Sequence, residues 1–435
     1  MVARTLRFVC EAVLLGTAVL LGARGLVLSW HRVQGPSMLP HYWGGGYRRL
    51  CPECGYLVRV ALSPREKRPA WCQCPLCGAA PLSLEQARYV PGQVLLLPRL
   101  AGRQNALQLW QPVLLHHPRQ PTRVLLKRIA GLPGQRVAIR RGQLVIDGHV
   151  AVKPPRLWHK LLVLVHDSRH QLAAPWASGW KTPSGAWQLS NRSFLFDVPA
   201  AGKSPPAEQN HGEPAAHWIH YQRGNQLLRG DLRGQPLLLD DTLGENQALP
   251  RRQETVHQID ELLLECELLW HRPGSLVLEL AGPRGVFRLR VDAAAGQAAL
   301  WINGRVVKQM PLGSSSQPVQ HLGLALLDGY VWHRAGGTWE KFPLPRAVPS
   351  LAPSVPVRVR IGASSGRGEL SRVRLWRDVY YLGPGGVLSY EFGRVPPGHV
   401  LVLGDNSFQS DDSRTWPSPW VPVELVLGRP LRPGW

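Results

Sequence analysis

The N-terminal residues carry the only apolar segment long enough to span a membrane. Arg4 and Arg7 precede an apolar stretch over residues 8–30, of which 12–23 is uninterrupted. The uninterrupted part alone has the length of the hydrophobic region of a cleaved signal peptide. Continued to Trp30, the stretch suffices for one spanning helix, and a retained anchor is the interpretation that we favour. The two arginines then place the N-terminus in the cytoplasm and the bulk of the chain outside.

Short apolar runs and alternating runs separated by turn residues predict strands over most of the remaining chain. The segment 87–100 contains a turn and then a continuous apolar strand. The segment 123–152 has the pattern of strand, turn and strand, followed by a hairpin that turns at Asp147-Gly148. The segment 398–416 is a strand followed by a polar turn. These three pieces flank a long middle region.

The middle region, from about 155 to 380, repeats the alternating pattern in runs such as SLVLEL, VFRLRVD and LGLALLDG. Their spacing is typical of a β-sandwich, and the pattern resembles jelly-roll modules of the concanavalin/laminin-G type. The polar, Pro- and Gly-rich stretch from about 200 to 250 is expected to form loops. Trp301, Trp332 and Trp339 could stack on sugars, although tryptophans in sandwiches are more often core. Carbohydrate binding and a purely structural insertion therefore both stay open.

Composition agrees with a β-rich chain of two to four domains. The 435 residues include 44 glycines and 40 prolines, and only 18% are charged. The net charge of +22 favours attraction to anionic lipid, given the apolar N-terminus. The sequence contains no helix-turn-helix or RNA-binding motif, so nucleic acid is not an expected partner.

Two C-x2-C knuckles, CPECG and CPLCG, have the spacing of a zinc ribbon. The expected ligands are Cys51, Cys54, Cys74 and Cys77, with Cys72 as a spare or as a substitute for Cys74. Four thiolates favour a tetrahedral Zn²⁺ and leave no open position for water, so the metal would be structural. Two disulfides are the alternative, because an exported location is oxidising.

Four further segments carry candidate chemistry, and each is weak by itself. A serine between prolines is usually structural, and GDNS is an ordinary turn. In their order, directly after the predicted anchor, they resemble the four successive boxes of the type I signal peptidase family. The resemblance covers roughly 1–50, 85–153 and 380–430, and its boxes are GPSMLP (35–40), PGQVLLLPR (91–99), KRIAGLPGQRV (127–137) and LGDNSFQSDDSRTW (403–416).

The resemblance implies a serine–lysine pair, in which Ser37 is the nucleophile and Lys127 the general base. A lysine base must be neutral, and burial against the apolar strand VLLK would lower its pKa. Ser410 matches the family's second serine, whose hydroxyl orients the lysine amine. Such a pair needs no histidine. Pro36 and Pro40 are expected to keep the chain around Ser37 extended.

The last box also implies supporting residues. Asp412 and Arg414 match an acid–base pair of the family that supports the catalytic residues without contacting the substrate. Asp405 and Asn406 match a structural turn. The backbone N–H of Ser37 would contribute to the oxyanion hole.

The chain departs from the family pattern at several positions in these boxes. Gly35 stands where some members have a serine that donates to the oxyanion, so a second donor must be something else. Gln93 and Gln135 replace aspartates, and Ser407 replaces an arginine. These changes bear on the turns around the site and remove neither the nucleophile nor the base.

We therefore predict a mainly β protein with a single N-terminal transmembrane helix. Its signal-peptidase-type catalytic domain is interrupted by a zinc ribbon and a jelly-roll-like sandwich. The predicted boundaries are 1–30 for the cytoplasmic tip and anchor, 31–50, 81–154 and 381–435 for the catalytic domain, 51–80 for the ribbon and 155–380 for the sandwich.

The family resemblance also implies the biological setting. The substrates would be exported preproteins with Ala-x-Ala-type cleavage sites, and catalysis would need no cofactor. The location would be the external face of a bacterial cytoplasmic membrane, with the N-terminus inside and anionic lipid as a partner.

Two other functions compete with this reading. The first is a weakened peptidase scaffold that presents a glycan-binding sandwich; joint retention of Ser37, Lys127, Ser410, Asp412 and Arg414 argues against it. The second is a serine–lysine self-cleaving repressor, which shares the core fold. The predicted anchor and the absence of a DNA-binding domain argue against the repressor.

Overall fold

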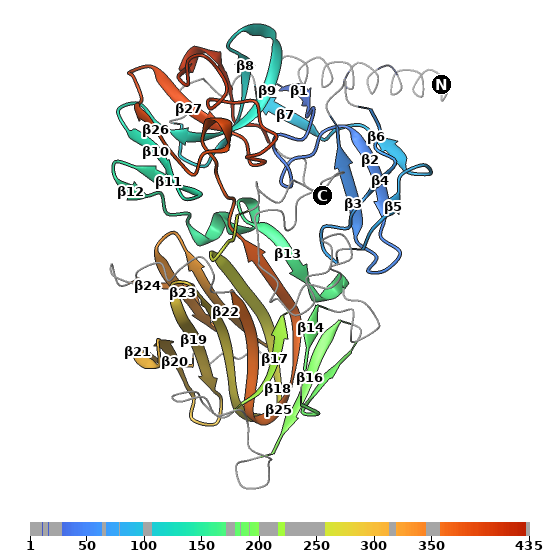
Figure 1. The fold of residues 1–435 in the computed structure, drawn as a ribbon, viewed down its shortest axis with the longest axis vertical. Helices are drawn as coiled ribbons and strands as arrows, with labels where there is room; N and C mark the ends of the chain where they lie inside the picture. The colour runs from blue at the N-terminus through green and yellow to red at the C-terminus, as the bar shows by residue number, and fades with distance from the viewer. Residues whose placement is uncertain are drawn as a thin grey trace, which may run out of the picture.

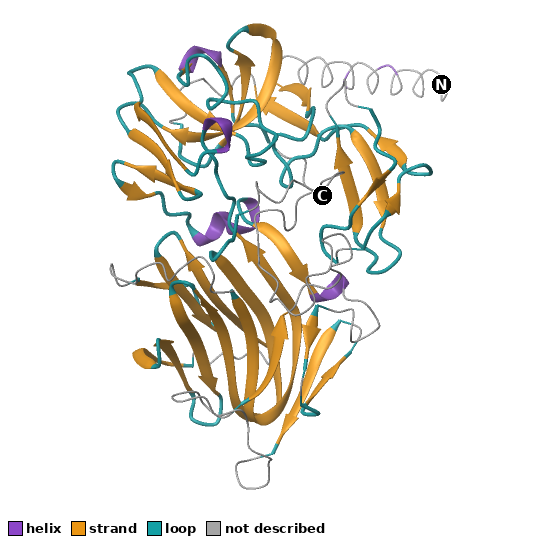
Figure 2. Cartoon of the chain, in the orientation of Figure 1, coloured by secondary structure: helices purple, strands orange, loops and turns teal. Residues whose placement is uncertain are grey.

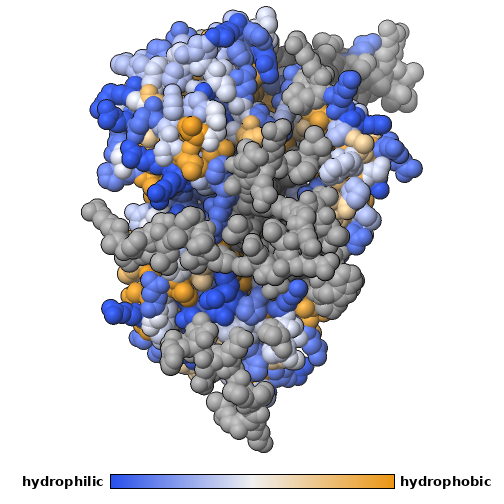
Figure 3. All heavy atoms as spheres, in the orientation of Figure 1, coloured by the Kyte–Doolittle hydropathy of each residue, from blue (hydrophilic) through white to orange (hydrophobic). Residues whose placement is uncertain are grey.

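The protein folds into two lobes built almost entirely of strands, joined by turns and short 3-10 helices (Figures 1 and 2). This confirms the mainly β prediction. Figure 3 shows a face on which polar side chains dominate and apolar ones gather in separate groups. The computed structural model describes residues 11, 16, 28–62, 67–77, 79–98, 107–170, 179–182, 184–190, 192–199, 216–221, 257–312, 319–344 and 357–431.

The predicted membrane anchor falls almost wholly outside the described residues. Within them, no helix has both the length and the apolar character needed to cross a bilayer. The range given to the anchor differs from the structure at its end, because Leu28–Arg32 forms strand β1. This strand pairs antiparallel with β7 (Val94–Pro98), and Trp30 on it is 68% exposed.

A five-stranded sheet in the upper lobe joins the middle of the chain to its C-terminal part. The strand order is β28-β27-β9-β8-β29. Residues 125–131 of β9 are all buried, because separate apolar clusters pack against the two faces of the sheet. The strands are β8 (Pro112–His117), β9 (Gln120–Gly131), β27 (His399–Leu403), β28 (Val421–Pro422) and β29 (Val426–Gly428).

A second sheet of the upper lobe has the order β12-β11-β10-β26. The predicted hairpin at Asp147-Gly148 is confirmed, since both residues have positive φ (49° and 84°) and link β11 to β12. The strands are β10 (Arg136–Arg140), β11 (Gln143–Ile146), β12 (His149–Val150) and β26 (Ser389–Arg394). Strand β26 follows the lower lobe in sequence, so the chain leaves the upper lobe and returns to it.

The cysteine-rich segment forms a small unit on the side of the upper lobe (Figure 1). It has a three-stranded sheet, β3-β2-β6, and a two-stranded sheet, β4-β5. Four of the cysteines lie in its own apolar core with Val58, Val60 and Leu84. The strands are β2 (Gly46–Leu50), β3 (Leu57–Ala61), β4 (Trp71–Cys72), β5 (Leu82–Ser83) and β6 (Arg88–Val90).

Two long strands organise the lower lobe, β18 (Leu262–Gly282) and β25 (Arg358–Arg377). They pair with each other along most of their length, at the centre of a 13-stranded sheet. The runs that predicted alternating strands lie in this sheet. Its other strands are β13 (Val163–Asp167), β14 (Trp180–Lys181), β15 (Trp187–Leu189), β16 (Ser193–Val198), β17 (His217–Tyr221), β19 (Gly285–Asp292), β20 (Gln297–Ile302), β21 (Arg305–Pro311), β22 (Val319–Leu327), β23 (Tyr330–Ala335) and β24 (Glu340–Pro343).

The register between the two long strands shifts near their middle, and such a bulge bends a strand. The first half of β18 pairs with β22 and the second half with β19. At the bend Gly274 and Gly366 face each other, and a Cβ on Gly366 would come within 2.8 Å of Gly274 Cα. One apolar core takes residues from both halves of the strand, such as Leu264 and Leu278.

The two lobes meet at a 3-10 helix, η1 (Pro155–Lys160). Its Trp158 packs edge-on against Trp332 and Trp339 of the lower lobe, with ring centroids 5.2 and 4.8 Å apart. These two tryptophans therefore contribute to the junction between the lobes, as the core interpretation expects. The third tryptophan named as a sugar platform, Trp301, lies in β20.

A buried charge cluster ties together the two chain segments that enter and leave the lower lobe. Lys153 Nζ lies 2.5 Å from Asp328 Oδ1 and 2.8 Å from Asp378 Oδ2. Lys153 precedes η1, and Asp378 directly follows β25. Glu261 is close to both carboxylates and pairs with Arg284. Buried ion pairs therefore hold the lower lobe at its root, which is the place where the chain enters and leaves it.

Candidate functional site

Ser37 lies in a tight turn that follows β1 and begins the upper lobe. The N–H of Leu39 donates to Pro36 O (3.0 Å), and the N–H of Tyr42 donates to Met38 O (2.9 Å). The chain here is therefore a series of turns, which differs from the extended segment that Pro36 and Pro40 suggested. The side chain of Met38 is 1% exposed and packs into an apolar cluster, which anchors the turn.

Lys127 is 1% exposed, in the stretch of β9 that is covered on both faces. Burial lowers the pKa of its amine to about 8, and this effect is partly opposed by the carboxylates of Asp412 and Asp411. A substantial fraction of the amine is then neutral near physiological pH. This is the property that a lysine general base requires.

Ser410 reaches Lys127 from the turn after β27. Lys127 Nζ donates to Ser410 Oγ at 3.0 Å, within a buried environment. The two residues approach the Ser37 turn at Gly404, where a Cβ would lie 2.1 Å from Ser410 Oγ and 2.4 Å from Ser37 O. Any side chain at 404 would push these groups apart. The structure thus brings the predicted nucleophile segment, base and orienting serine to one place.

Asp412 and Arg414 form a buried pair with two hydrogen bonds, Nε to Oδ1 (2.8 Å) and Nη2 to Oδ2 (2.6 Å). Burial raises the pKa of Asp412, but the guanidinium of Arg414 outweighs it and holds that pKa below its usual range. The Asp412 carboxylate also accepts from the N–H of Gly404 at 2.8 Å. The pair therefore supports the backbone that separates Ser37 from Ser410.

Asp405 makes side-chain contacts beyond the structural turn that the sequence predicted for it. Arg128 donates to it twice, from Nε (2.6 Å) and Nη2 (2.5 Å), and His41 Nδ1 lies 2.9 Å from its Oδ2. Burial alone would raise the pKa of Asp405, yet the guanidinium of Arg128 and the His41 contact hold it far below its usual range. Sequence reasoning missed both partners. Arg128 could have been found, since it follows Lys127 directly and points to the other face of the strand.

Asn406 forms hydrogen bonds to the nucleophile turn, which is the turn around Ser37. Its backbone N–H donates to Ser37 O at 3.0 Å, and its Nδ2 donates to Pro36 O at 3.2 Å. The same Nδ2 donates to Gln409 Oε1. Since these bonds hold the backbone on both sides of the Ser37 N–H, they fix the direction in which that N–H points.

Gln135 and Ser407, which depart from the family pattern, both accept hydrogen bonds that stabilise turns. Gln135 Oε1 accepts from the N–H of Leu132 at 2.8 Å and closes the turn after β9. Ser407 Oγ accepts from the N–H of Leu382 (2.9 Å) and from Arg414 Nη1 (2.5 Å). At these two positions, the replacing side chain stabilises the local geometry.

A cavity of about 450 Å³ opens beside Ser410. One wall is the glycine-rich loop that returns from the lower lobe, which includes the 3-10 helix η5 (Pro384–Gly386). A second wall includes Phe408, which is 48% exposed. His257, from the segment before β18, also lines it. Residues of the insertion thus contribute to the surroundings of the catalytic candidates.

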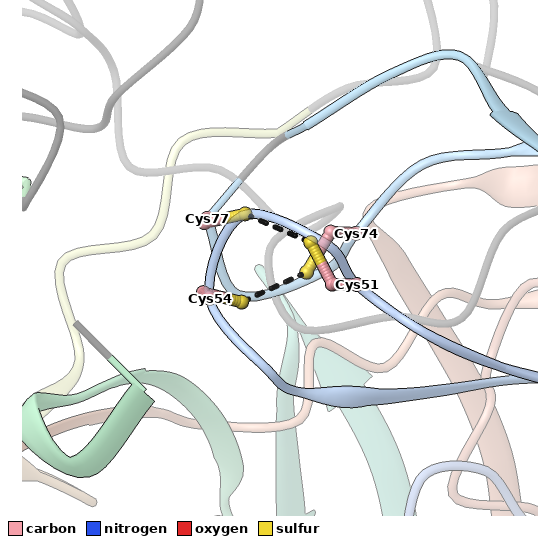
Figure 4. Close-up of side chains that lie close together, drawn as sticks. All are labelled: Cys51, Cys54, Cys74 and Cys77. Carbon is pink, nitrogen blue, oxygen red and sulfur yellow. Dashed lines mark hydrogen bonds between the residues drawn. The ribbon is translucent and has the colours of Figure 1, made fainter. Parts of the chain in front are cut away.

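The four predicted metal ligands converge in the ribbon, as Figure 4 shows. The Sγ atoms lie 3.6 Å apart for Cys51 and Cys77, and 3.7 Å apart for Cys54 and Cys74. A disulfide needs about 2.05 Å. A tetrahedral Zn²⁺ with Zn–S bonds of about 2.3 Å separates its sulfurs by about 3.8 Å, so the spacing fits that ion. Cys72 is buried and lies outside the tetrad.

The chain belongs to the family described as "Signal peptidase, peptidase S26". The family profile matches residues 6–185 and 377–435, which is more than half of the chain. The unmatched residues contain most strands of the 13-stranded sheet.

One relative of this chain is the mitochondrial ATP-independent inner membrane protease subunit 1a of Arabidopsis thaliana. It is 36% identical over 90 residues, which are 20% of this chain and 54% of that protein. The chain therefore spans about half the length of the relative that it matches.

Solved structures resemble parts of the fold at low similarity. A carbohydrate-binding module, CBM66 from Bacillus subtilis, has 11% identity and a TM-score of 0.25, over 45% of this chain and 93% of that one. The alginate lyase A1-II' has 10% identity and a TM-score of 0.29, over 50% of this chain and 93% of that one. With such low scores, these likenesses carry no conclusion about a ligand.

Proposed function

We propose that this protein is a membrane-bound serine endopeptidase of the signal peptidase I type, with Ser37 as nucleophile and Lys127 as general base. The single observation that carries the proposal is the buried amine of Lys127, which donates to Ser410 Oγ at 3.0 Å beside the backbone of Ser37. Burial of a lysine amine costs folding free energy, so its presence at this position favours a functional role. Membership of the peptidase S26 family supports the same role.

The reaction would proceed through an acyl-enzyme. Neutral Lys127 Nζ takes the proton of Ser37 Oγ while that oxygen bonds to the scissile carbonyl carbon, whose oxygen becomes negative. The N–H of Ser37 donates to this oxyanion. When the C–N bond breaks, Lys127 returns the proton to the leaving amine. Water then repeats the sequence on the ester, which releases the acid and restores Ser37.

The substrates that we propose are exported preproteins cut after Ala-x-Ala-type sites. Small residues at the first and third positions before the cut would fit shallow apolar subsites. The N-terminal apolar segment would hold the enzyme in the bacterial cytoplasmic membrane, with the catalytic domain outside. The net charge of +22 would favour anionic lipid at that surface.

We further propose that the four-cysteine cluster holds one structural Zn²⁺. Four thiolates at the observed spacing fill a tetrahedral shell, so the ion would stabilise the ribbon and take no part in the reaction. The ribbon begins soon after the Ser37 turn, and Gly44 packs against the backbone of Gly35. Metal binding would therefore also steady the segment that carries the nucleophile.

The proposal is tested with the purified full chain in detergent and a preprotein that carries an Ala-x-Ala site. We expect the wild type to cut at that site. Ser37→Ala and Lys127→Ala should each lose at least about 10³-fold in kcat/KM, as for members of a catalytic unit. Ser389→Ala and Lys181→Ala, at exposed positions, are the controls and should retain activity. No cleavage by the wild type, or cleavage by both active-site variants, would rule the assignment out.

A further inference from the structure

Three arginines form a row across the three-stranded sheet of the ribbon. Arg48 on β2 lies directly opposite Arg59 on β3 and Arg88 on β6 in the strand register. Residues that face each other across antiparallel strands project to the same side of the sheet. Val58 and Val60, which alternate with Arg59 along β3, pack into the cysteine-containing core on the other side. The three arginines therefore face away from that core.

The charges in this row oppose one another. Burial lowers the pKa of the Arg59 guanidinium, and the neighbouring charge of Arg48 lowers it further. Like charges placed directly opposite each other destabilise a sheet. Within the part of the chain that the structure describes, the side chains of Arg48 and Arg88 form no hydrogen bond and no ion pair with a carboxylate. An anion bound at the row would offset this repulsion.

Trp43 holds two of these side chains in place. The guanidinium carbons of Arg48 and Arg59 lie 3.9 and 3.7 Å from the centroid of its ring, which is a cation–π distance. Stacking on a ring restricts a guanidinium but leaves the N–H groups in its plane able to donate. An anion would therefore meet donors whose positions are already fixed, so its binding would cost little side-chain entropy.

The row lies close to the strand in which the apolar N-terminal segment ends. That segment covers 8–30, and β1 ends at Arg32. The N–H of Val33, the next residue, donates to Gln93 O (2.9 Å), and the N–H of Gln93 donates to Trp43 O (3.0 Å). Figure 1 shows the ribbon sheet beside β1 and β7. A membrane anchor in the N-terminal segment would therefore hold the row near the bilayer surface.

An exposed apolar side chain flanks the row. Leu50 lies two residues after Arg48, on the same face of β2, and is 63% exposed. A surface that combines arginines with an exposed apolar side chain suits the interface of a bilayer, where anionic headgroups lie directly above the acyl chains. A free anion would contact the arginines alone. The apolar neighbour therefore favours a lipid as the source of the anion.

We propose that Arg48, Arg59 and Arg88 bind the phosphate groups of anionic lipid headgroups and hold the ribbon against the bilayer surface. Arginine suits this task, because its planar guanidinium can donate two hydrogen bonds to one phosphate. The ribbon follows the turn that carries Ser37, so headgroup binding would also hold the nucleophile at the bilayer surface. The inference rests on the proposed function, since it needs the N-terminal segment to be a membrane anchor.

The experiment compares two lipids on the full chain in a neutral detergent. Dioctanoyl phosphatidylglycerol is anionic, and dioctanoyl phosphatidylcholine is zwitterionic with the same acyl chains. Native mass spectrometry measures the fraction of chains that carry each lipid as its concentration is raised. We expect the wild type to bind phosphatidylglycerol more tightly, by about 30-fold in Kd, because each arginine at the surface adds attraction to an anionic headgroup.

Two double variants test whether the row causes this preference. Arg48→Gln/Arg88→Gln removes two charges of the row and should lower the preference to about twofold or threefold. Arg192→Gln/Arg305→Gln removes two charges at exposed positions of the lower lobe and is the matched control. It should keep most of the preference, because exposed charges act weakly beyond a Debye length of about 10 Å. An equal loss in the two double variants would overturn the inference, since overall charge would then explain the binding.

Two measurements on the wild type decide the inference even if the row variant folds poorly. The preference should weaken as sodium chloride is added, because salt screens the attraction between arginines and headgroups. A preference that salt leaves unchanged would overturn the inference. Inorganic phosphate at the concentration of the lipid should leave phosphatidylglycerol bound. Displacement by inorganic phosphate would assign the row to a free anion and would also overturn the inference.

The lipid measurement and the cleavage assay fail independently of each other, because lipid binding requires no cleavage. A wild type that prefers phosphatidylglycerol but cuts no preprotein would refute the peptidase assignment alone. A wild type that cuts preprotein but shows no preference between the two lipids would overturn the headgroup site alone.

Discussion

The amine of Lys127 and the hydroxyl of Ser410 are joined by a hydrogen bond of 3.0 Å between residues 283 positions apart. A neutral amine has two N–H groups and one lone pair. When one N–H is held by Ser410, rotation about the last bond of the side chain is restricted, and the lone pair has a defined direction. The bond therefore supplies orientation, while burial supplies the neutral form.

The first prediction concerns the pH dependence of cleavage. Burial lowers the pKa of Lys127 to about 8 from an ordinary value of 10.5, and only the deprotonated amine can accept the proton of Ser37. Cleavage should therefore rise with pH, with a midpoint near 8 rather than near 10.5. The measurement is kcat/KM against pH for one preprotein. A flat profile between pH 7 and 9 would contradict this role for Lys127.

Asp412 offers a test of whether the rising limb belongs to Lys127, because its carboxylate shifts the pKa of that lysine in a known direction. Its carboxylate raises the pKa of Lys127, so Asp412→Asn should shift the rising limb to lower pH. The variant also leaves Arg414 buried without its partner, which should cost about 3–5 kcal/mol of stability. The double variant Asp412→Asn/Arg414→Met should recover part of that loss. A limb that moves to higher pH would mean that Asp412 acts on Lys127 in another way.

Removal of the Ser410 hydroxyl should slow catalysis without weakening binding. We expect Ser410→Ala to lower kcat about 10²-fold with KM little changed, because the lysine loses orientation in a proton-transfer step. Ser410→Thr keeps the hydroxyl and should retain more activity than the alanine variant. Equal losses in the two variants would indicate that the space beside Gly404, rather than the hydroxyl, is what matters.

Local patterns were sufficient to predict much of the fold. The hairpin at Asp147-Gly148 follows from two residues that tolerate positive φ between alternating strands. Several strands of the lower lobe follow from alternating runs, such as VFRLRVD in β19 and LGLALL in β22. The close contact between Gly274 and Gly366 joins strands about 90 residues apart. Such a contact has no signature in a local window.

The same division applies to the candidate site. Ser37, Lys127 and Ser410 were predicted by resemblance to a family, and the structure places them around Gly404. Arg128 and His41 were missed, because their importance depends on Asp405, which lies 277 residues after Arg128. A histidine beside a proline turn looks like any surface histidine until its contact with Asp405 is known.

Zinc content should distinguish the four clustered cysteines, which we propose to bind the metal, from Cys72, which lies outside the cluster. We expect about one Zn²⁺ per wild-type chain by elemental analysis, and loss of that ion from Cys74→Ser, because a tetrahedral site needs all four thiolates. Cys72→Ser is the matched control, since Cys72 is also buried but lies outside the tetrad, and it should keep the metal. Metal-free wild type with its thiols oxidised would show that the ribbon is held by disulfides instead.

The stability of the protein should depend strongly on Lys153, the cation at the root of the inserted lobe. Lys153 Nζ lies between Asp328 and Asp378, where burial and the neighbouring carboxylates raise the pKa of Asp378 to about 7, against the opposing effect of Lys153. Lys153→Met would leave these carboxylates buried without that cation, and we expect a loss of about 3–5 kcal/mol in urea unfolding at pH 8.

Two further measurements identify the cause of that loss. The loss should shrink as pH falls, because a carboxyl with a raised pKa takes up a proton readily and its neutral form needs no cation. Lys153→Met/Asp378→Asn should likewise recover part of the stability, since one of the two charges is removed. Lys181→Met, at an exposed lysine, should change stability by less than about 0.5 kcal/mol. A loss from Lys153→Met that is the same at every pH would mean that its aliphatic chain, rather than its charge, holds the lobes together.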